Sequence, residues 1–242
     1  MTPVTPGSYR PTPAAAQRTL ALRGRAFSDE PLAAERTALV IIDMQNHFVA
    51  EGGAGEVPPA RSIVGAINQL ATEMRARAVP VVWIQTTASR ALELWPQHHS
   101  SVLTPERAQR RLASLAEQSW GFAIYPELAV EPFDLRLTKV HYSAFIPGSS
   151  RLHEELRARG IDTILIAGTA TNVCCESTGR DAMMMNYRVV MVSDATATWT
   201  AAEHTATLDL FGTFFGDVLS VDEIVARIRP TQKKIGLKEI GV

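Results

Sequence analysis

Three side chains of complementary reactivity each stand at or just after the end of a short apolar run: Asp43, Lys139 and Cys174. A carboxylate can take up or release a proton, a thiolate is a strong nucleophile, and an ammonium group biases the local charge. Together they would suit attack of the sulfur on a small carbonyl compound. Taken singly, an Asp at a strand end is a helix or turn cap about as often as not, a Lys there is usually a solvated strand end, and a Cys near a helix start is most often core filler. The functional prediction therefore depends on the three being brought together.

The segment around Cys174 predicts the local structure that positions its side chain. Residues 168–174 read Gly-Thr-Ala-Thr-Asn-Val-Cys, a pattern typical of a strand end, a tight loop and a helix start that Thr171 or Asn172 could cap. Cys174 would lie in the first helical turn, where the helix N-terminus and the nearby ammonium group are expected to lower its pKa. Free N–H groups of the loop would face an oxyanion on the attacked carbonyl. Cys175 lies about 100° further round a helix and is predicted to pack in the core.

The remaining motifs predict neither a metal nor a cofactor. Gly53 and Gly55 resemble the start of a dinucleotide-binding loop, but Pro58 stands where the third glycine is needed. The histidines, including the vicinal pair His98 and His99, show no regular ligand spacing. The chain also lacks a Walker loop, a nucleophile-elbow serine and a His-Glu-x-x-His helix.

From Thr37 onward the chain alternates short apolar runs with stretches of helical period, which is typical of buried parallel strands joined by helices. The predicted strands are 37–43, 80–85, 135–139, 162–168, 188–193 and 217–220. The predicted helices are 60–78, 105–117, 150–159, 172–185 and 200–211. This order predicts a three-layer α/β/α fold, doubly wound around a mainly parallel six-stranded sheet. Ligands bind beyond the carboxyl ends of such strands, where the three reactive side chains fall.

The composition excludes several partners. Lys and Arg total 24 against 25 Asp and Glu, a net charge of −1 with no basic stripe, so nucleic acid is not expected to bind. The apolar runs are far shorter than the ~20 residues that cross a bilayer, which predicts no membrane span. The chain does not open with a secretory signal pattern, and its two cysteines are adjacent, so we expect a cytoplasmic protein.

The first 36 residues form a segment of different character. Prolines at positions 3, 6, 11 and 13 disfavour both helix and sheet interior, which predicts an N-terminal arm over 1–36 before one domain over 37–242. Leu20, Leu22 and Phe27 of this arm need burial, either on their own subunit or on a neighbour. We therefore expect a closed homo-oligomer, from dimer to tetramer.

Three ordered segments resemble those that mark the isochorismatase-like cysteine hydrolases. They are 38–46 (Ala-Leu-Val-Ile-Ile-Asp-Met-Gln-Asn), 139–145 (Lys-Val-His-Tyr-Ser-Ala-Phe) and 168–174, and the similarity runs from about 37 to 228. The resemblance implies the fold predicted above, oligomerisation, and the use of a cysteine nucleophile.

The same resemblance assigns roles to residues. It implies that Cys174 is the nucleophile and that Asp43 and Lys139 are its catalytic partners. It also implies an oxyanion hole at a cis peptide bond between Thr169 and Ala170, with the N–H groups of Ala170 and Cys174 as donors.

Departures from the family pattern limit which of the family's reactions this chain is expected to catalyse. Its nicotinamidases carry Asp-x-His and a further His after the second strand to bind a metal, whereas residues 85–90 read Gln-Thr-Thr-Ala-Ser-Arg. This argues against a metal and against nicotinamide. His47 stands where the family usually has Asp, and we expect it to alter a capping contact. Members that hydrolyse isochorismate lack the cysteine, so its presence favours acyl transfer.

Residues 119–122, 174–181 and 211–216 most resemble the amidohydrolases that act on ureidoacrylate, biuret and other carbamoyl compounds. We therefore predict hydrolysis of a C–N bond in a small linear amide or ureide through a thioester. A small-molecule substrate is the expected partner. The predicted substrate contacts are Trp83, Gln85, Trp120, Tyr142, Thr169 and Asn172.

Three alternatives stay open. The same site could act on a nicotinamide-like ring amide or an isochorismate-type vinyl ether, which a panel of ureides would distinguish by ammonia release. A catalytically silent binding protein could keep the fold, although it would be expected to lose at least one of the three reactive residues. A redox role of Cys174 and Cys175 is disfavoured because they lack Cys-x-x-Cys spacing.

Overall fold

The computed structural model describes residues 9–28 and 30–229. Its main sheet has six parallel strands in the order β4-β3-β2-β5-β6-β7, which confirms the predicted fold class. The strands are β2 (Thr37–Ile42), β3 (Val81–Thr86), β4 (Leu135–Lys139), β5 (Thr163–Thr169), β6 (Arg188–Ala197) and β7 (Asp217–Leu219). β6 is longer than predicted, since it continues past Ser193. A separate pair joins β1 (Leu32–Ala33) to β8 (Ile228–Arg229).

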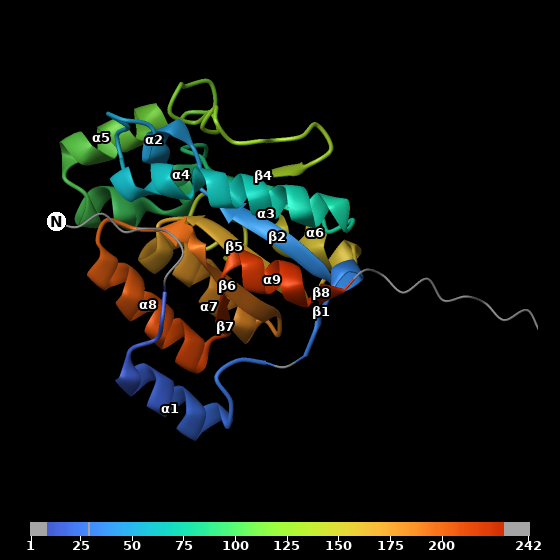
Figure 1. Cartoon of the computed structure of the whole chain (residues 1–242). Coiled ribbons are helices and arrows are strands. Elements are labelled where there is room, and N and C mark those ends of the chain that lie inside the picture. The colour runs from blue at the N-terminus through green and yellow to red at the C-terminus, as the bar shows by residue number, and fades with distance from the viewer. Residues whose placement is uncertain (1–8, 29, 230–242) are drawn as a thin grey trace, which may run out of the picture.

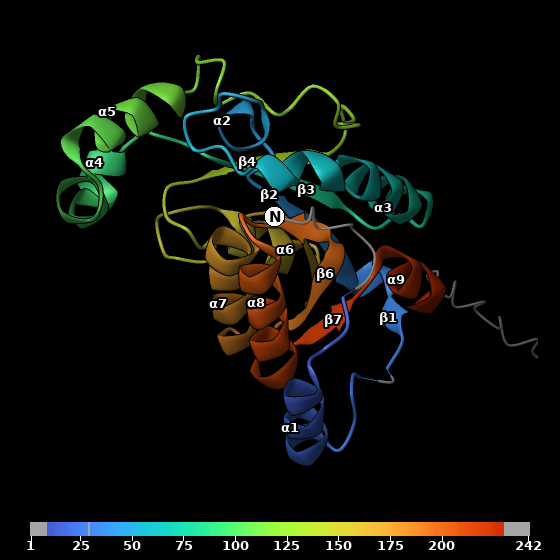
Figure 2. The same ribbon diagram turned by 60° about the vertical axis from the view of Figure 1, so that its left-hand side comes forward.

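Helices cover both faces of the sheet, giving three layers (Figure 1; Figure 2). One face carries α3 (Val64–Ala76) and α9 (Val221–Arg227), and the other carries α6 (Leu152–Ala158), α7 (Glu176–Met184) and α8 (Ala201–Phe214). In the central strand β2, Leu39 and Ile41 face the first layer, while Val40 and Ile42 face the second. Because both of their faces are buried, β2, β3 and β5 are mainly apolar runs, whereas burial alternates along the edge strand β4.

Short elements fill the connections. They are η1 (Ala34–Arg36), α2 (Asn46–Val49), η2 (Pro58–Ile63), α4 (Ala91–Leu94), η3 (His98–Val102), α5 (Pro105–Ser114) and η4 (Thr171–Cys175). Most were not predicted, because one or two turns are too short to show a helical period. Within the described ranges, no helix has the length and apolar character needed to span a membrane.

The described part of the N-terminal arm contains a helix, and the expectation that its prolines disfavour a helix was wrong there. Helix α1 (Pro13–Arg23) begins at a proline, and the side chain of Thr12 accepts a hydrogen bond from the N–H of Ala15. The first helical position leaves its N–H unbonded in any case, so proline is tolerated there. Proline content therefore determined where the helix starts rather than whether it forms.

Helix α1 of the arm lies on its own chain and packs beside α8 (Figure 1). The hydroxyl oxygens of Thr19 and Thr213 are 3.0 Å apart, and Arg23 pairs with Asp217 at 2.5 Å. Leu20 and Leu22 are not buried by this packing, being 52% and 59% exposed.

The strand order places a topological switch between β2 and β5. The chain continues from β2 to β3 and β4 on one side, and from β5 to β6 and β7 on the other. Open α/β sheets bind ligands at the carboxyl ends of the strands flanking such a switch. Close approach of the two strands requires Gly168, whose φ is +113°. A Cβ added there would lie 2.1 Å from the carbonyl oxygen of Ile42.

We expect Gly168→Ala to lower the free energy of unfolding by about 3 kcal/mol or more, since the new methyl group collides with backbone and the φ is unfavourable for alanine. The matched control is Gly65→Ala in α3, where an added Cβ meets nothing within 4 Å. That change should be neutral or stabilising by about 0.5–1 kcal/mol. Urea denaturation measures both, and equal unfolding midpoints would contradict the close approach.

Candidate active site

A buried ion pair joins the ends of two strands. Asp43 directly follows β2 and Lys139 ends β4. The ammonium Nζ lies 2.8 Å from the carboxylate Oδ2, and both side chains are 0% exposed. The backbone of Asp43 is left-handed, with φ 56°, which turns the chain out of the strand and is a conformation that Asp tolerates better than most residues. Burial alone would lower the pKa of Lys139, but the adjacent carboxylate outweighs it and the pKa is raised. Lys139 is therefore an ammonium ion.

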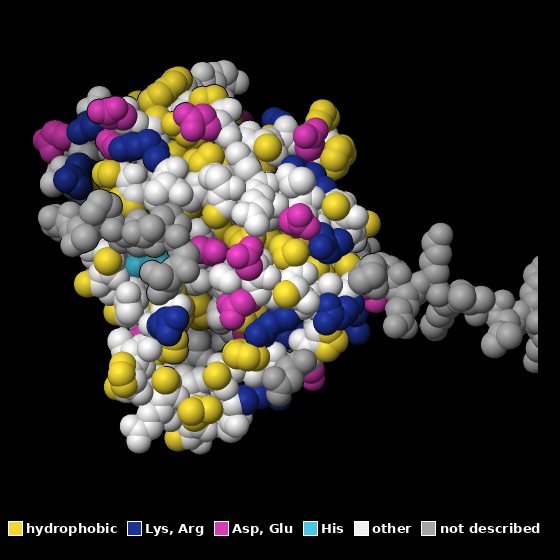
Figure 3. Space-filling view, in the orientation of Figure 1, with side chains coloured by type: hydrophobic (Ala, Val, Ile, Leu, Met, Phe, Trp, Pro, Cys, Tyr) yellow, Lys and Arg dark blue, Asp and Glu magenta, His cyan; other side chains and the backbone are white. Residues whose placement is uncertain are grey.

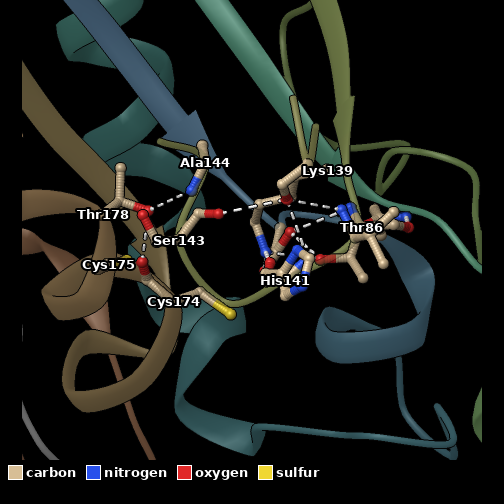
Figure 4. A network of polar contacts seen from close by, with 12 residues as sticks. Thr86, Lys139, His141, Ser143, Ala144, Cys174, Cys175 and Thr178 are labelled. Carbon is tan, nitrogen blue, oxygen red and sulfur yellow. Dashed lines mark hydrogen bonds and ion pairs between the residues drawn. The ribbon is translucent and has the colours of Figure 1, made fainter. Parts of the chain in front are cut away.

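Thr86, the last residue of β3, completes the pair, and sequence analysis missed it. Its hydroxyl donates to Asp43 Oδ1 at 2.8 Å and accepts from Lys139 Nζ at 2.7 Å, while its N–H donates to the same Oδ1 at 3.1 Å. Lys139 also donates to the carbonyl of His141 at 3.1 Å (Figure 4). Because Thr86 stands at a strand end, the rule that found the other residues could also have found it.

Cys174 lies in η4, the π-helical turn between the end of β5 and the start of α7. Its side chain is buried and points toward the polar group around Lys139 (Figure 4). The turn is tied to the segment after β4, because the Thr178 hydroxyl donates to the Cys174 carbonyl at 2.7 Å and accepts from the Ala144 N–H at 3.2 Å. The predicted convergence of carboxylate, ammonium and thiol on one sheet edge is thus present in the structure.

The thiol has a raised pKa, so the expectation of a lowered value was wrong. Burial, together with the charge of Asp43 and hydrogen bonding to that carboxylate, raises the pKa of Cys174 to about 12. Lys139 acts in the opposite direction but does not reverse the shift, because its charge is compensated by Asp43. The site therefore holds a neutral thiol beside a carboxylate and an ammonium group.

The predicted helix cap is also absent from η4. Thr171 pairs its hydroxyl with Nδ1 of His204 at 2.9 Å, and Asn172 accepts from the Thr198 hydroxyl at 2.6 Å. Helix α7 begins only at Glu176. Cys174 therefore lies in the π-helical turn that runs directly into α7, rather than in α7 itself.

The loop before η4 has the predicted cis peptide bond between Thr169 and Ala170. Thr169 is fully buried and its hydroxyl donates to the carbonyl of Ala197 at 3.2 Å, which joins β5 to β6. The carbonyl of Ala170 accepts from the N–H groups of Val173 and Cys175 and so points into the π-helical turn.

The structure places Tyr142 near the catalytic residues and Trp83 away from them. Burial raises the pKa of Tyr142. The charges of Cys174 and Lys139 also influence this pKa, so the phenol lies near these two residues. Its ring packs edge-on to Trp95 at 4.7 Å between centroids. Trp83 is 1% exposed in the core on the α3 face, where it donates to Asp134 at 2.8 Å. The proposal that Trp83 contacts substrate is therefore wrong, because alternation along β3 turns it away from Thr86.

Gln85 and Trp120 are placed at the loop of residues 119–123. The side-chain amide of Gln85 donates to the carbonyl of Phe122 at 2.9 Å, so it holds the loop. The carbonyl of Trp120 accepts from Asn46 at 2.9 Å, and its side chain is exposed. Gln45, another residue that sequence analysis missed, connects this loop to β3 by donating to Phe122 and Thr86 carbonyls, both at 3.0 Å.

Histidine and acidic residues do not gather into a metal centre in the described part of the chain, where no group of three or more His, Cys, Asp or Glu could hold an ion. The vicinal His98 and His99 instead pack against Trp95, with His98 stacked on it at 4.0 Å between ring centroids.

Comparison with known proteins identifies the family. The sequence profile of the Isochorismatase domain matches residues 37–223, most of the chain. The chain belongs to the isochorismatase family. The resemblance seen in the three sequence segments is confirmed. Together with the amidohydrolase relatives described next, the family match indicates a hydrolase that acts on carbon–nitrogen bonds other than peptide bonds.

The chain is similar to two curated amidohydrolases and to a solved cysteine hydrolase. The chain is 37% identical over 212 residues to ureidoacrylate amidohydrolase RutB of Stutzerimonas stutzeri, covering 80% of this chain and 84% of the relative. It is 36% identical over 219 residues to RutB of Variovorax paradoxus, covering 83% and 85%. A solved cysteine hydrolase from Pseudomonas syringae superposes with a TM-score of 0.71 at 30% identity, covering 83% of this chain and 96% of that one.

The raised thiol pKa predicts an alkaline loss of stability. Folded Cys174 stays protonated to about pH 12, whereas a cysteine in the unfolded chain ionises near ~8.5. Between these values the unfolded state binds fewer protons, so the free energy of unfolding falls as pH rises. Cys174→Ala should reduce this slope by about 1.4 kcal/mol per pH unit between about pH 9 and pH 11.

Chemical denaturation at a series of pH values measures this slope. Ser177→Ala, a change of similar size without a titrating group, should retain the wild-type slope. Lys139 also has a raised pKa and destabilises in the same direction, but the largest influence that raises it is the charge of Asp43, which all three proteins retain. Identical slopes in wild type and Cys174→Ala would show that the buried thiol does not resist ionisation.

Proposed function

We propose that the protein hydrolyses a small linear ureide or carbamoyl compound through a thioester on Cys174. The observation that carries the proposal is the neutral, buried thiol beside the Asp43–Lys139 ion pair. The RutB relatives are named for ureidoacrylate, so a ureido compound is the substrate class that we carry to this chain. The reaction as proposed uses neither a metal nor a cofactor.

The first half-reaction begins with proton transfer. Asp43 takes the proton of the Cys174 thiol as the sulfur attacks the substrate carbonyl carbon, and the carbonyl π electrons move onto oxygen. We propose the N–H groups of Ala170 and Cys174 as donors to this oxyanion, the role that fixed backbone donors play in other acyl transfers. The Thr86 hydroxyl and N–H hold one oxygen of Asp43, and Lys139 holds the other, which fixes the base toward the thiol.

The second half-reaction returns the proton. The tetrahedral intermediate collapses, the C–N bond breaks, and the proton on Asp43 passes to the departing nitrogen, leaving a thioester. Asp43 then removes a proton from water as the water oxygen attacks the thioester, and the released thiolate recovers that proton. Lys139 stabilises negative charge on Asp43, the sulfur or the oxyanion in turn, so these groups titrate jointly rather than independently.

The two cysteines should differ sharply in function. Cys174→Ala is expected to lower kcat/KM by about 10³-fold or more, because it removes the atom that attacks the carbonyl. Cys175→Ala should keep most of the activity. Cys175 is fully buried, with its sulfur 4.0 Å from the Ala167 carbonyl in the core. Ammonia release from ureidoacrylate and other ureides measures both variants.

Alkylation mapping gives a second measurement. Iodoacetamide should inactivate the wild-type protein by labelling Cys174, and substrate should protect that residue. Inactivation by labelling of Cys175 alone would refute the assignment of the nucleophile.

We also propose that the protein forms a closed homo-oligomer, from dimer to tetramer, in the cytoplasm. The support is apolar surface on neighbouring helices, since Leu20 and Leu22 of α1 are 52% and 59% exposed and Phe214 of α8 is 49% exposed. Light scattering should give a mass above one chain at micromolar concentration. Replacing both leucines by serine should lower that mass if α1 lies in the interface. A monomeric wild-type protein would refute oligomerisation.

A further inference from the structure

Helix α5 presents three arginines on one face. Arg107, Arg110 and Arg111 stand at positions i, i+3 and i+4 of the helix, where side chains are neighbours. All three line one cavity of about 330 Å³, together with His47 and Trp199. In Figure 3 basic side chains reach the surface at upper left, beside acidic ones, in the region where Figure 1 places α5.

These arginines have no carboxylate partner among the described residues, where none of the ion pairs includes them. The acidic residue that lines the same cavity, Glu56, is already paired with Arg61 at 2.8 Å. Like charges at this helical spacing destabilise a helix unless an anion lies between them. The cavity therefore has an uncompensated positive charge.

The cavity is adjacent to the reactive group. Arg111 also lies close to Thr87 and Val140, the residues that directly follow Thr86 and Lys139. The charge of Arg111 reaches the thiol, since it is one of the influences that lower the pKa of Cys174 against the larger effect of burial. Arg111 thus lies between the arginine-lined cavity and the carboxyl ends of β3 and β4.

His47 fastens α5 at this position. It follows Asp43 by four residues, and its Nδ1 lies 2.8 Å from the hydroxyl of Ser114 at the end of α5. Burial, followed by the charge of Arg111, lowers the pKa of His47 to about 4, so the imidazole is neutral. The positive charge of the cavity is consequently that of the arginines.

We propose that this cavity binds the carboxylate of the substrate, and that Arg111 is the residue that selects anionic ureido or carbamoyl compounds over neutral ones. Guanidinium groups bind carboxylates through paired, charge-assisted hydrogen bonds. Arg107 and Arg110, which are exposed, attract the anion toward the cavity. The identity of the substrate rests on the proposed function, whereas the anion site rests on the residues of α5 alone.

Two alkylating reagents of different charge test the anion site without any hydrolysis. Iodoacetate carries a carboxylate and iodoacetamide is its neutral counterpart, and both transfer their two-carbon group to the Cys174 sulfur with loss of iodide. The ratio of their labelling rates at Cys174, read by tandem mass spectrometry, should fall about tenfold or more in Arg111→Gln. Arg111→Lys, which retains the charge, should recover part of the ratio and shows that the effect is not a loss of folding.

Arg18→Gln is the matched control. Arg18 is an exposed arginine of α1, outside the described ion pairs and on a helix remote from α5 (Figure 1). Its removal changes the net charge equally and should leave the ratio unchanged. An unchanged ratio in Arg111→Gln, or an equal fall in Arg18→Gln, would overturn the anion site.

Hydrolysis then tests the substrate assignment. Wild type should prefer ureidoacrylate over its methyl ester, and Arg111→Gln should lower the ratio of kcat/KM for the acid to kcat/KM for the ester about tenfold or more. Equal losses for acid and ester would overturn the assignment of the carboxylate to Arg111. Absence of hydrolysis of every ureide, with the labelling ratio still sensitive to Arg111, would refute the proposed function and retain the anion site.

Discussion

The reactive edge of the sheet depends on the buried ion pair between Asp43 and Lys139. Two charges removed from water are costly unless each remaining hydrogen-bonding position is filled. Here Thr86 and the carbonyl of His141 fill them. Strand register makes this possible, because Ile42 pairs with Ile84 and Thr86 pairs with Lys139 across three adjacent strands. A shift of one residue in β2 or β4 would turn a charged side chain into an apolar layer.

The same burial determines the state of the nucleophile. A thiol in a site of low polarity beside a carboxylate keeps its proton, and the ammonium group that would favour the thiolate is already compensated. Ionisation of Cys174 is therefore coupled to attack on the substrate rather than completed beforehand. Asp43 therefore has two roles. It compensates the charge of Lys139 before the reaction and carries the thiol proton during it.

Segments outside the sheet surround this common centre. The loop of residues 119–123 is held by Gln45, Gln85 and Asn46, and α5 is fastened through His47. Apart from Gln85 in β3, these residues belong to the segment that directly follows β2. The sheet thus positions the groups that break the bond. The loops and short helices between the strands determine which charges lie near the substrate. Such connections are where a shared fold acquires different specificities.

The sequence by itself determined the six strands and the three reactive residues at their ends, because strands buried on both faces must be apolar runs and parallel strands end at one edge. Only the tertiary structure decided the pKa of Cys174, the part played by Thr86, the removal of Trp83 from the site and the packing of the N-terminal helix on α8. These properties depend on burial, side-chain direction and charges from segments far apart in the chain. A local pattern contains none of that information, since it specifies neither the neighbours of a side chain nor its exposure to water.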